Sequence, residues 1–300
     1  MKEPMSILEF QRRFKTDEDC ISAIARKRWP DGFVCPHCQS AHVKRLAKRR
    51  AFQCNGCKRQ TSITAGTIFE KTRIPLLNWF FMMFLMANDK GGVSATRISL
   101  LLNMRYDTVW HILEKLRIAM GERDELYQLC GSIEIDEGFF GGSDKGGRRG
   151  RGAKKKVPVL VFVESQGDHA GMLKMQILER GVNMASVRET VENRVKPQQF
   201  FEADGFGVYG ILSAIGHRVT FRKSLQHEVD KRLVWVHKAI SLAKRFILGT
   251  YHGVSGKHLQ HYLDEFCFRW NRRRFETGLF MRLVATAAWC APVHYSAVTG

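Results

Sequence analysis

Two Cys-x-x-Cys pairs constrain the fold of this 300-residue chain more than any other feature. Cys35 and Cys38 form the first pair, Cys54 and Cys57 form the second, and fifteen residues separate the two. Two tight turns at this spacing can present four thiolates tetrahedrally to one zinc ion. Four protein ligands leave no open coordination position, so we expect a structural site. The sequence predicts a zinc ribbon over residues 29–62; a redox pair and a chance spacing are the alternatives.

The ribbon carries a run of basic residues between its cysteine pairs. Residues 43–50 read Val-Lys-Arg-Leu-Ala-Lys-Arg-Arg and predict a basic hairpin that either contacts phosphates or is simply solvated. His37 lies between the first two ligands and is expected to be exposed rather than a fifth ligand. The other four cysteines stand alone in the sequence and are interpreted as small hydrophobic residues in a reducing compartment.

The charge of the chain favours a polyanionic partner. Its 48 Lys and Arg residues outnumber 29 Asp and Glu residues, which gives a formal net charge of +19. Such a charge attracts nucleic acid, although a basic protein with a scattered, solvated surface would show it as well. A hydrophobic content of 44% can bury a sizeable core, and the length suggests about two domains.

Neither a membrane span nor a secretory signal is expected. The longest apolar run, residues 79–87, is much shorter than the ~20 residues that cross a bilayer. The N-terminus carries acids where a secretory signal would carry a basic region and an apolar core. We therefore expect no membrane partner and a cytoplasmic, nucleoid-associated protein.

Helical periodicity dominates the chain before residue 130, outside the ribbon. Residues 1–28 predict a helical lead-in, with Asp17 a possible N-cap of its second helix. Residues 74–125 predict three helices, of which the second begins after Ser94 and breaks at Asn103. The short turn before the third helix fits a helix-turn-helix that contacts DNA. An ordinary helical hairpin that packs onto the next domain is the alternative.

From residue 132 onwards the sequence alternates with the period of strands. The predicted strands are 132–140, 157–164, 172–178, 199–203 and 217–222. A helix at 185–195 precedes the fourth strand, and a short helix at 209–215 precedes the fifth. This order predicts a mixed α/β domain. The loop at 141–156 consists almost entirely of Gly, Lys and Arg, which indicates a flexible hairpin tip that could also grip phosphates.

Two aspartates each close an apolar run of a predicted strand. They are Asp136 and Asp204, and both can lie at strand ends that face one cleft. Clustered carboxylates can hold the divalent ions that activate the attacking oxygen and stabilise the leaving oxygen in phosphodiester cleavage. Glu134 shares a strand face with Asp136, whereas Glu137 points to the opposite face. Either aspartate could instead be a turn residue.

Residues 30–275 resemble the insertion-sequence transposases of the ISXO-like group. The matching features are the four-cysteine ribbon, Ile-Asp-Glu-Gly-Phe-Phe-Gly-Gly at 135–142, Ala-Asp-Gly at 203–205, and the long run 243–273. The resemblance implies a zinc ribbon and a helix-turn-helix segment before an α/β, RNase H-like catalytic domain of the DDE type with a mixed five-stranded sheet. That domain is expected at residues 130–278 and a C-terminal tail at 279–300.

Carried onto this chain, the resemblance implies four catalytic residues. The first and second acidic metal ligands fall on Asp136 and Asp204, the third ligand position on His237, and the basic residue one heptad later on Lys244. Seven residues are about two helical turns, so His237 and Lys244 share a helix face.

Histidine at the third position departs from the Glu that many relatives carry. Imidazole nitrogen suits manganese better than magnesium. The alternative is that His237 is a core or phosphate-contacting residue, in which case Glu228 or Asp230 on the preceding loop could replace it.

A basic and aromatic stretch follows the third ligand position. Lys244, Arg245, Arg272 and Arg273 are the expected DNA-binding residues. Tyr262, Phe266 and Trp270 recur every four residues and are better interpreted as the buried face of a helix than as base-stacking groups.

The resemblance implies a transposase that binds the ends of an insertion sequence and catalyses metal-dependent hydrolysis and strand transfer. Its partners are then double-stranded DNA, as terminal inverted repeats and target, and other copies of the chain in a homodimer or larger assembly. Its metals are structural Zn²⁺ and catalytic Mg²⁺ or Mn²⁺. The alternative is a zinc-ribbon DNA-binding regulator or a catalytically inactive domesticated transposase.

Overall fold

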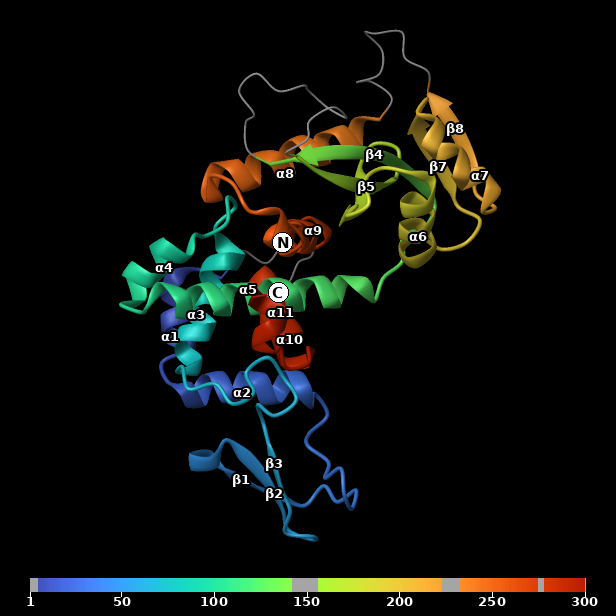
Figure 1. Cartoon of the computed structure of the whole chain (residues 1–300). Coiled ribbons are helices and arrows are strands. Elements are labelled where there is room, and N and C mark those ends of the chain that lie inside the picture. Colours follow the sequence, from blue (N-terminus) through green and yellow to red (C-terminus); the bar gives the residue numbers. More distant parts are fainter. Residues whose placement is uncertain (1–4, 142–155, 223–232, 275–277, 300) are drawn as a thin grey trace. The chain divides into compact units, whose positions relative to one another are not determined.

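The computed structural model describes residues 5–141, 156–222, 233–274 and 278–299 (Figure 1). It contains two compact units, Met1–Arg123 with Arg274–Gly300, and Asp124–Arg273. Within these described ranges no helix is both long enough and apolar enough to cross a membrane.

The first unit consists of helices and a small antiparallel sheet of order β1-β2-β3. Its elements are α1 (Ile7–Arg13), α2 (Asp17–Arg28), β1 (Val43–Leu46), η1 (Ala47–Arg49), β2 (Ala51–Cys54), β3 (Gln60–Ser62), α3 (Leu76–Asn88), α4 (Ala95–Leu102), α5 (Tyr106–Glu125), α10 (Leu279–Trp289) and α11 (Tyr295–Thr299). The sheet is the ribbon predicted from the cysteine spacing.

Thr16, and not Asp17, is the N-cap of α2. The Thr16 hydroxyl accepts the N–H of Asp19 at 3.3 Å, and the Asp19 carboxylate accepts the N–H of Thr16 at 2.9 Å. This reciprocal pair is a capping box. Asp17 instead accepts from Arg50 at 2.7 Å and from the N–H of Leu77 at 3.0 Å. Its carboxylate therefore links α2 to the ribbon and to α3.

The last residues of the chain, expected as a tail, contain α10, whose apolar face is buried in the first unit. The Phe280 ring lies 5.7 Å from the rings of Phe10 and Phe14 and 6.0 Å from those of Phe80 and Phe84. Phe280 is only 2% exposed. The C-terminal helix thus completes the core around α1 and α3.

The second unit is built on a mixed five-stranded sheet of order β6-β5-β4-β7-β8. Its elements are β4 (Ser132–Phe140), β5 (Val157–Ser165), β6 (Ala170–Ile177), α6 (Met184–Arg194), β7 (Phe200–Asp204), η3 (Gly207–Gly210), α7 (Ile211–Ala214), β8 (Arg218–Arg222), α8 (Val234–Tyr251) and α9 (Gly256–Asn271). The first three strands are antiparallel, and β7 and β8 run parallel to β4. This confirms the mixed α/β sheet expected of an RNase H-like fold.

Apolar side chains cover both faces of this sheet. On one face, the residues of β5 and β6 pack against α8 and α9 around Val161, Val236 and Leu263. On the other face, Ile135 and Phe201 pack against α6 and α7. Consecutive side chains of β4 alternate between the two clusters, so a polar residue in β4 faces a defined layer of helices.

Glycine at position 138 permits the close packing of α8 on β4. A Cβ atom there would lie 2.9 Å from the Phe140 ring and 3.3 Å from Ile240. Because both neighbours are buried, Gly138→Ala should destabilise the fold by about 1–3 kcal/mol through overpacking. Urea denaturation measures the loss. Gly207→Ala is the matched control, because no heavy atom lies within 4 Å of its added Cβ, and an equal loss there would contradict the packing argument.

Candidate functional site

Asp136 and Asp204 occupy adjacent positions on neighbouring parallel strands. Ile135 pairs with Ala203, so the two aspartates follow the last paired residues of β4 and β7. Asp204 ends β7, whereas Asp136 lies in the middle of β4, which corrects the expectation that both close their strands. Parallel pairing with β7 stops beside Asp136, while β4 continues along β5. Ile135 and Ala203 both point into the α6 layer, so both aspartates face the α8 side of the sheet.

His237 lies in the first turn of α8, directly beside Asp136. Its Nε2 atom is 3.2 Å from Oδ2 of Asp136, and the two side chains are 29% and 16% exposed. Two ligands of one divalent ion lie roughly 3 Å apart when each bond is ~2.1 Å long. The separation and the partial exposure of this pair therefore fit a shared ion, with one oxygen and one nitrogen donor.

Asp204 is held next to this pair rather than in contact with both members. Its Oδ1 atom accepts the N–H of Phe206 at 3.0 Å. Asp136, Asp204 and His237 do not bring one ligand atom each within 4.8 Å of one another in the part of the chain described here. A shared ion with all three ligands therefore requires the Asp204 side chain to turn towards the other two.

Glu137 points away from the aspartates, as strand alternation predicts. Its Oε2 atom accepts a hydrogen bond of 2.7 Å from the hydroxyl of Tyr209, which is fully buried on the opposite face of the sheet. Burial, and next the charge of Glu137, raise the pKa of Tyr209 well above its usual range. No local pattern in the sequence pointed to Tyr209, because its partner Glu137 lies 72 residues earlier in the chain.

Lys244 lies at the edge of a pocket of about 120 Å³ in the second unit. Lys156 and apolar residues including Phe140 and Leu248 also line it. Burial, and next the charge of Lys156, lower the pKa of Lys244, while Asp136 acts in the opposite direction. Two neighbouring ammonium groups beside apolar walls can take a phosphate together with a sugar or base. Lys156 escaped notice in the sequence because it ends the glycine-basic loop.

The three expected DNA-binding arginines differ in their surroundings. Arg245 is exposed on α8. Arg272 is paired with Asp124 at 2.6 Å, its side chain is 8% exposed, and its guanidinium lies 3.5 Å from the centroid of the Phe268 ring. Arg273 stacks 4.4 Å from the Trp270 ring and donates to the carbonyl of Trp270 at 2.6 Å. These contacts give Arg272 and Arg273 structural partners, whereas Arg245 faces solvent.

The aromatic residues of α9 form a buried helix face, as predicted. Tyr262 is 7% exposed, and Phe266 and Trp270 are half-buried against the cluster around Val161, Val236 and Leu263. The fallback ligands Glu228 and Asp230, and most of the glycine-basic loop, lie outside the described residues.

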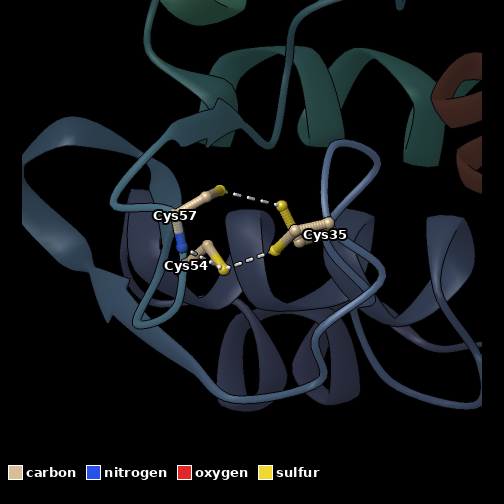
Figure 2. A group of neighbouring side chains, drawn as sticks. Cys35, Cys54 and Cys57 are labelled. Carbon is tan, nitrogen blue, oxygen red and sulfur yellow. Dashed lines mark hydrogen bonds between the residues drawn. The ribbon is translucent and has the colours of Figure 1, made fainter.

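The four cysteines of the ribbon converge on one point, as Figure 2 shows for three of them. Sγ of Cys35 lies 3.6 Å from Sγ of Cys57, and Sγ of Cys38 lies 3.4 Å from Sγ of Cys54. All four sulfur atoms lie within 4.8 Å of one another and none is in a disulfide. Tetrahedral zinc with ~2.3 Å bonds places its sulfur ligands roughly 3.8 Å apart, so the cluster fits zinc.

Backbone N–H groups favour the thiolate form at two of these cysteines. The N–H of Cys57 points at Sγ of Cys54 at 3.5 Å and is the main reason that the pKa of Cys54 falls to about 6. The N–H of His37 chiefly lowers the pKa of Cys35. Since zinc binds thiolate and not thiol, these donors prepare the site for metal. His37 itself is exposed and accepts from Arg59 at 2.6 Å, away from the sulfur cluster.

The basic hairpin divides into residues paired with an acid and exposed residues. Arg45 reaches Glu18 at 2.5 Å and Arg50 reaches Asp17 at 2.7 Å, so both attach the ribbon to α2. Lys44, Lys48 and Arg49 are exposed. Arg45 and Arg50 are therefore engaged within the protein, whereas Lys44, Lys48 and Arg49 present their charge to solvent.

A short turn joins α4 and α5, and their assignment as a helix-turn-helix stays a prediction. Ser94 caps α4 by accepting the N–H of Arg97 at 3.2 Å, and Asn103 ends that helix in the left-handed conformation with φ of 48°. α5 begins at Tyr106, which is 51% exposed. DNA contact by this element stays a prediction.

Comparison with known proteins agrees with this architecture. Residues 128–271 match the ISXO2-like transposase domain, and residues 15–60 match the transposase zinc-ribbon domain. The chain thus carries an ISXO2-like transposase domain behind a transposase zinc ribbon. This transposase is also 26% identical, over 282 residues, to an uncharacterized protein in transposable element ISH50 of Halobacterium salinarum. That match covers 86% of this chain and 92% of the relative.

Two solved structures show distant similarity to the transposase. A chain of a pre-cleavage Mos1 transpososome matches with a TM-score of 0.30 and 12% identity, over 70% of this chain and 76% of that one. A chain of the simian T-cell lymphotropic virus intasome in complex with PP2A regulatory subunit B56 gamma matches with a TM-score of 0.30 and 11% identity. The latter match covers 45% of this chain and spans about half, 48%, of the intasome chain.

Proposed function

We propose that this transposase binds the ends of an insertion sequence and catalyses metal-dependent cleavage and strand transfer at Asp136, Asp204 and His237. The observation that carries the proposal is the 3.2 Å approach of His237 to Asp136, beside the adjacent Asp204 on the α8 face of the sheet. A divalent ion bound there would activate the attacking oxygen and stabilise the leaving oxygen.

The chain's own residues would hold the reacting groups in place. Asp136 and His237 supply one ligand each from two rigid elements, and Asp204 supplies a third by turning from the N–H of Phe206. Lys244 and Lys156, beside the apolar walls of their pocket, would bind a phosphate of the strand that is cut. Arg245, exposed on the same helix, would contact the DNA backbone.

The first unit would recognise the DNA. We propose that zinc shapes the ribbon so that Lys44, Lys48 and Arg49 reach phosphates, and that α4 and α5 dock on the element's ends. Pairing of two ends requires at least two copies of the chain on DNA.

Matching inverted repeats beside the coding region would provide the substrate for the decisive test. End-labelled DNA carrying those repeats should be nicked and joined by the purified protein in Mg²⁺ or Mn²⁺. Binding without nicking or joining under either metal would support the alternative, a regulator or an inactive domesticated transposase, for which the histidine at the third ligand position is the supporting observation.

His237→Glu should retain cleavage and shift the metal preference towards Mg²⁺. A carboxylate replaces a nitrogen donor with the oxygen donor that Mg²⁺ prefers. The ratio of the cleavage rate in Mg²⁺ to that in Mn²⁺ should rise at least ~10-fold. This is the lower end of the change in metal affinity or activity that follows when the surroundings of metal ligands are altered. His169→Glu, on the turn before β6, is the matched control and should leave the ratio unchanged. A folded His237→Glu protein without activity would argue against ligand exchange at this position.

A further inference from the structure

Glu134 connects the strand that carries Asp136 to the helix that carries His237. Its carboxylate is buried between β4 and α8, with the residue 4% exposed. Oε2 accepts the N–H of Trp235 at 2.8 Å and the N–H of Val236 at 2.9 Å. One oxygen of a residue more than 100 positions earlier therefore satisfies two N–H groups in the first turn of α8.

Among the residues that the structure describes, none of α8's own side chains caps its N-terminus. Leu233 occupies the N-cap position, makes no side-chain hydrogen bond to the helix, and no acid lies in the first turn. The first N–H groups of a helix have no partner within the helix and carry partial positive charge. Glu134 supplies both the acceptor and the negative charge that the first turn of α8 lacks. Its loss would leave N–H groups unpaired, one of them in the buried residue Val236.

The spacing places this cap next to the proposed ligands. Glu134 and Asp136 lie two residues apart on one face of β4. On the helix, His237 follows the two capped residues immediately. Two hydrogen bonds to one oxygen fix the position of α8 along β4 and the rotation of its first turn about the helix axis. Position and rotation together determine where the His237 imidazole lies relative to Asp136.

We propose that Glu134 is the positioning residue of the metal site, holding the first turn of α8 so that His237 and Asp136 meet as a ligand pair. The inference rests on the proposed function of that pair. Glu134 touches backbone N–H groups and no reacting atom, so it acts through His237.

The chain contains a matched control in Glu164 of β5. This carboxylate is also buried, at 8% exposure, and accepts two backbone N–H groups at 3.0 Å, those of Cys130 and Met172. It caps no helix of the site. Glu164→Ala therefore removes a buried carboxylate that accepts two hydrogen bonds, but leaves the hydrogen bonds to the first turn of α8 in place.

The test compares Glu134→Ala and Glu164→Ala in the full, zinc-loaded chain. Mn²⁺ binding is followed by electron paramagnetic resonance without DNA, with Asp136→Asn identifying the signal of this site. Hydrogen exchange of the peptide over residues 233–240 is measured in parallel. Both variants should lose thermal stability, but only Glu134→Ala should weaken Mn²⁺ binding, by about 10–100-fold, and lose protection in the first turn of α8.

Two further variants separate the effect of the Glu134 side chain's length from the effect of its charge. Glu134→Asp keeps the charge but is one methylene short, so it should behave like Glu134→Ala. Glu134→Gln keeps an acceptor oxygen at full reach and should retain most of the Mn²⁺ affinity. Native Mn²⁺ affinity in folded Glu134→Asp, or equal weakening in Glu164→Ala, would overturn the proposal. If the native chain bound no Mn²⁺ at this site, the proposed function itself would fail. Separately, if the first turn of α8 kept its exchange protection in Glu134→Asp, the role of Glu134 as the cap of α8 would be refuted.

Discussion

Asp136→Asn should abolish DNA cleavage and strand transfer while leaving DNA binding intact. The substitution replaces a charged oxygen ligand by a neutral amide at the point where β4, β7 and the first turn of α8 meet. An amide holds a divalent ion far less strongly than a carboxylate. We expect a loss of at least ~10²–10³-fold in cleavage rate, the scale seen when one preorganised electrostatic group is removed. End-labelled DNA carrying the element's repeats gives the rate, and a gel shift gives the affinity.

Asp168→Asn is the control for this experiment. Asp168 lies on the turn between β5 and β6 and its side chain is 92% exposed, so the same chemical change occurs outside the site. Asp204→Asn should match Asp136→Asn in effect. Unchanged cleavage in both site variants would contradict the enzymatic proposal. A parallel loss of DNA binding would show that the effect of the substitution is not confined to the metal site.

The strands of the second unit were predictable because their signal is local. Alternation of apolar and polar residues marked Ser132–Phe140 as a strand and separated Glu134 from Glu137 by face. The parallel register that makes Asp136 and Asp204 neighbours is not local, and the resemblance to a known family supplied that pairing. The strand order then confirmed the α/β fold.

Long-range partners explain what the sequence did not reveal. The cap of α8 comes from a strand about 100 residues earlier, and the N-cap position itself holds Leu233, so the usual signal for a helix start is absent. Likewise, composition does not reveal that Arg45 is paired with Glu18 and Arg272 with Asp124. Pairing of this kind depends on which elements meet in space, which single-residue preferences do not encode.

Removal of zinc should unfold the ribbon and abolish binding of the element's ends. The ribbon's own core contains only three buried residues, Phe33, Cys35 and Cys54, and two of these are proposed ligands. A core of this size cannot offset the conformational entropy of ordering the segment, so the metal must supply the difference. Structural zinc contributes ~10–16 kcal/mol in comparable small sites, and that binding energy becomes folding energy.

Cys54→Ser should reproduce the effect of a chelator, because it removes one of the four sulfur ligands. Zinc content by elemental analysis should fall from one ion per chain to none, and exchange protection should vanish over residues 43–62. Cys130→Ser, at an exposed cysteine outside the ribbon, should change neither. The second unit has its own two apolar clusters, so its Mn²⁺ binding should survive in Cys54→Ser. A Cys54→Ser protein that still held one zinc and bound the repeats normally would show that the ribbon folds on other interactions.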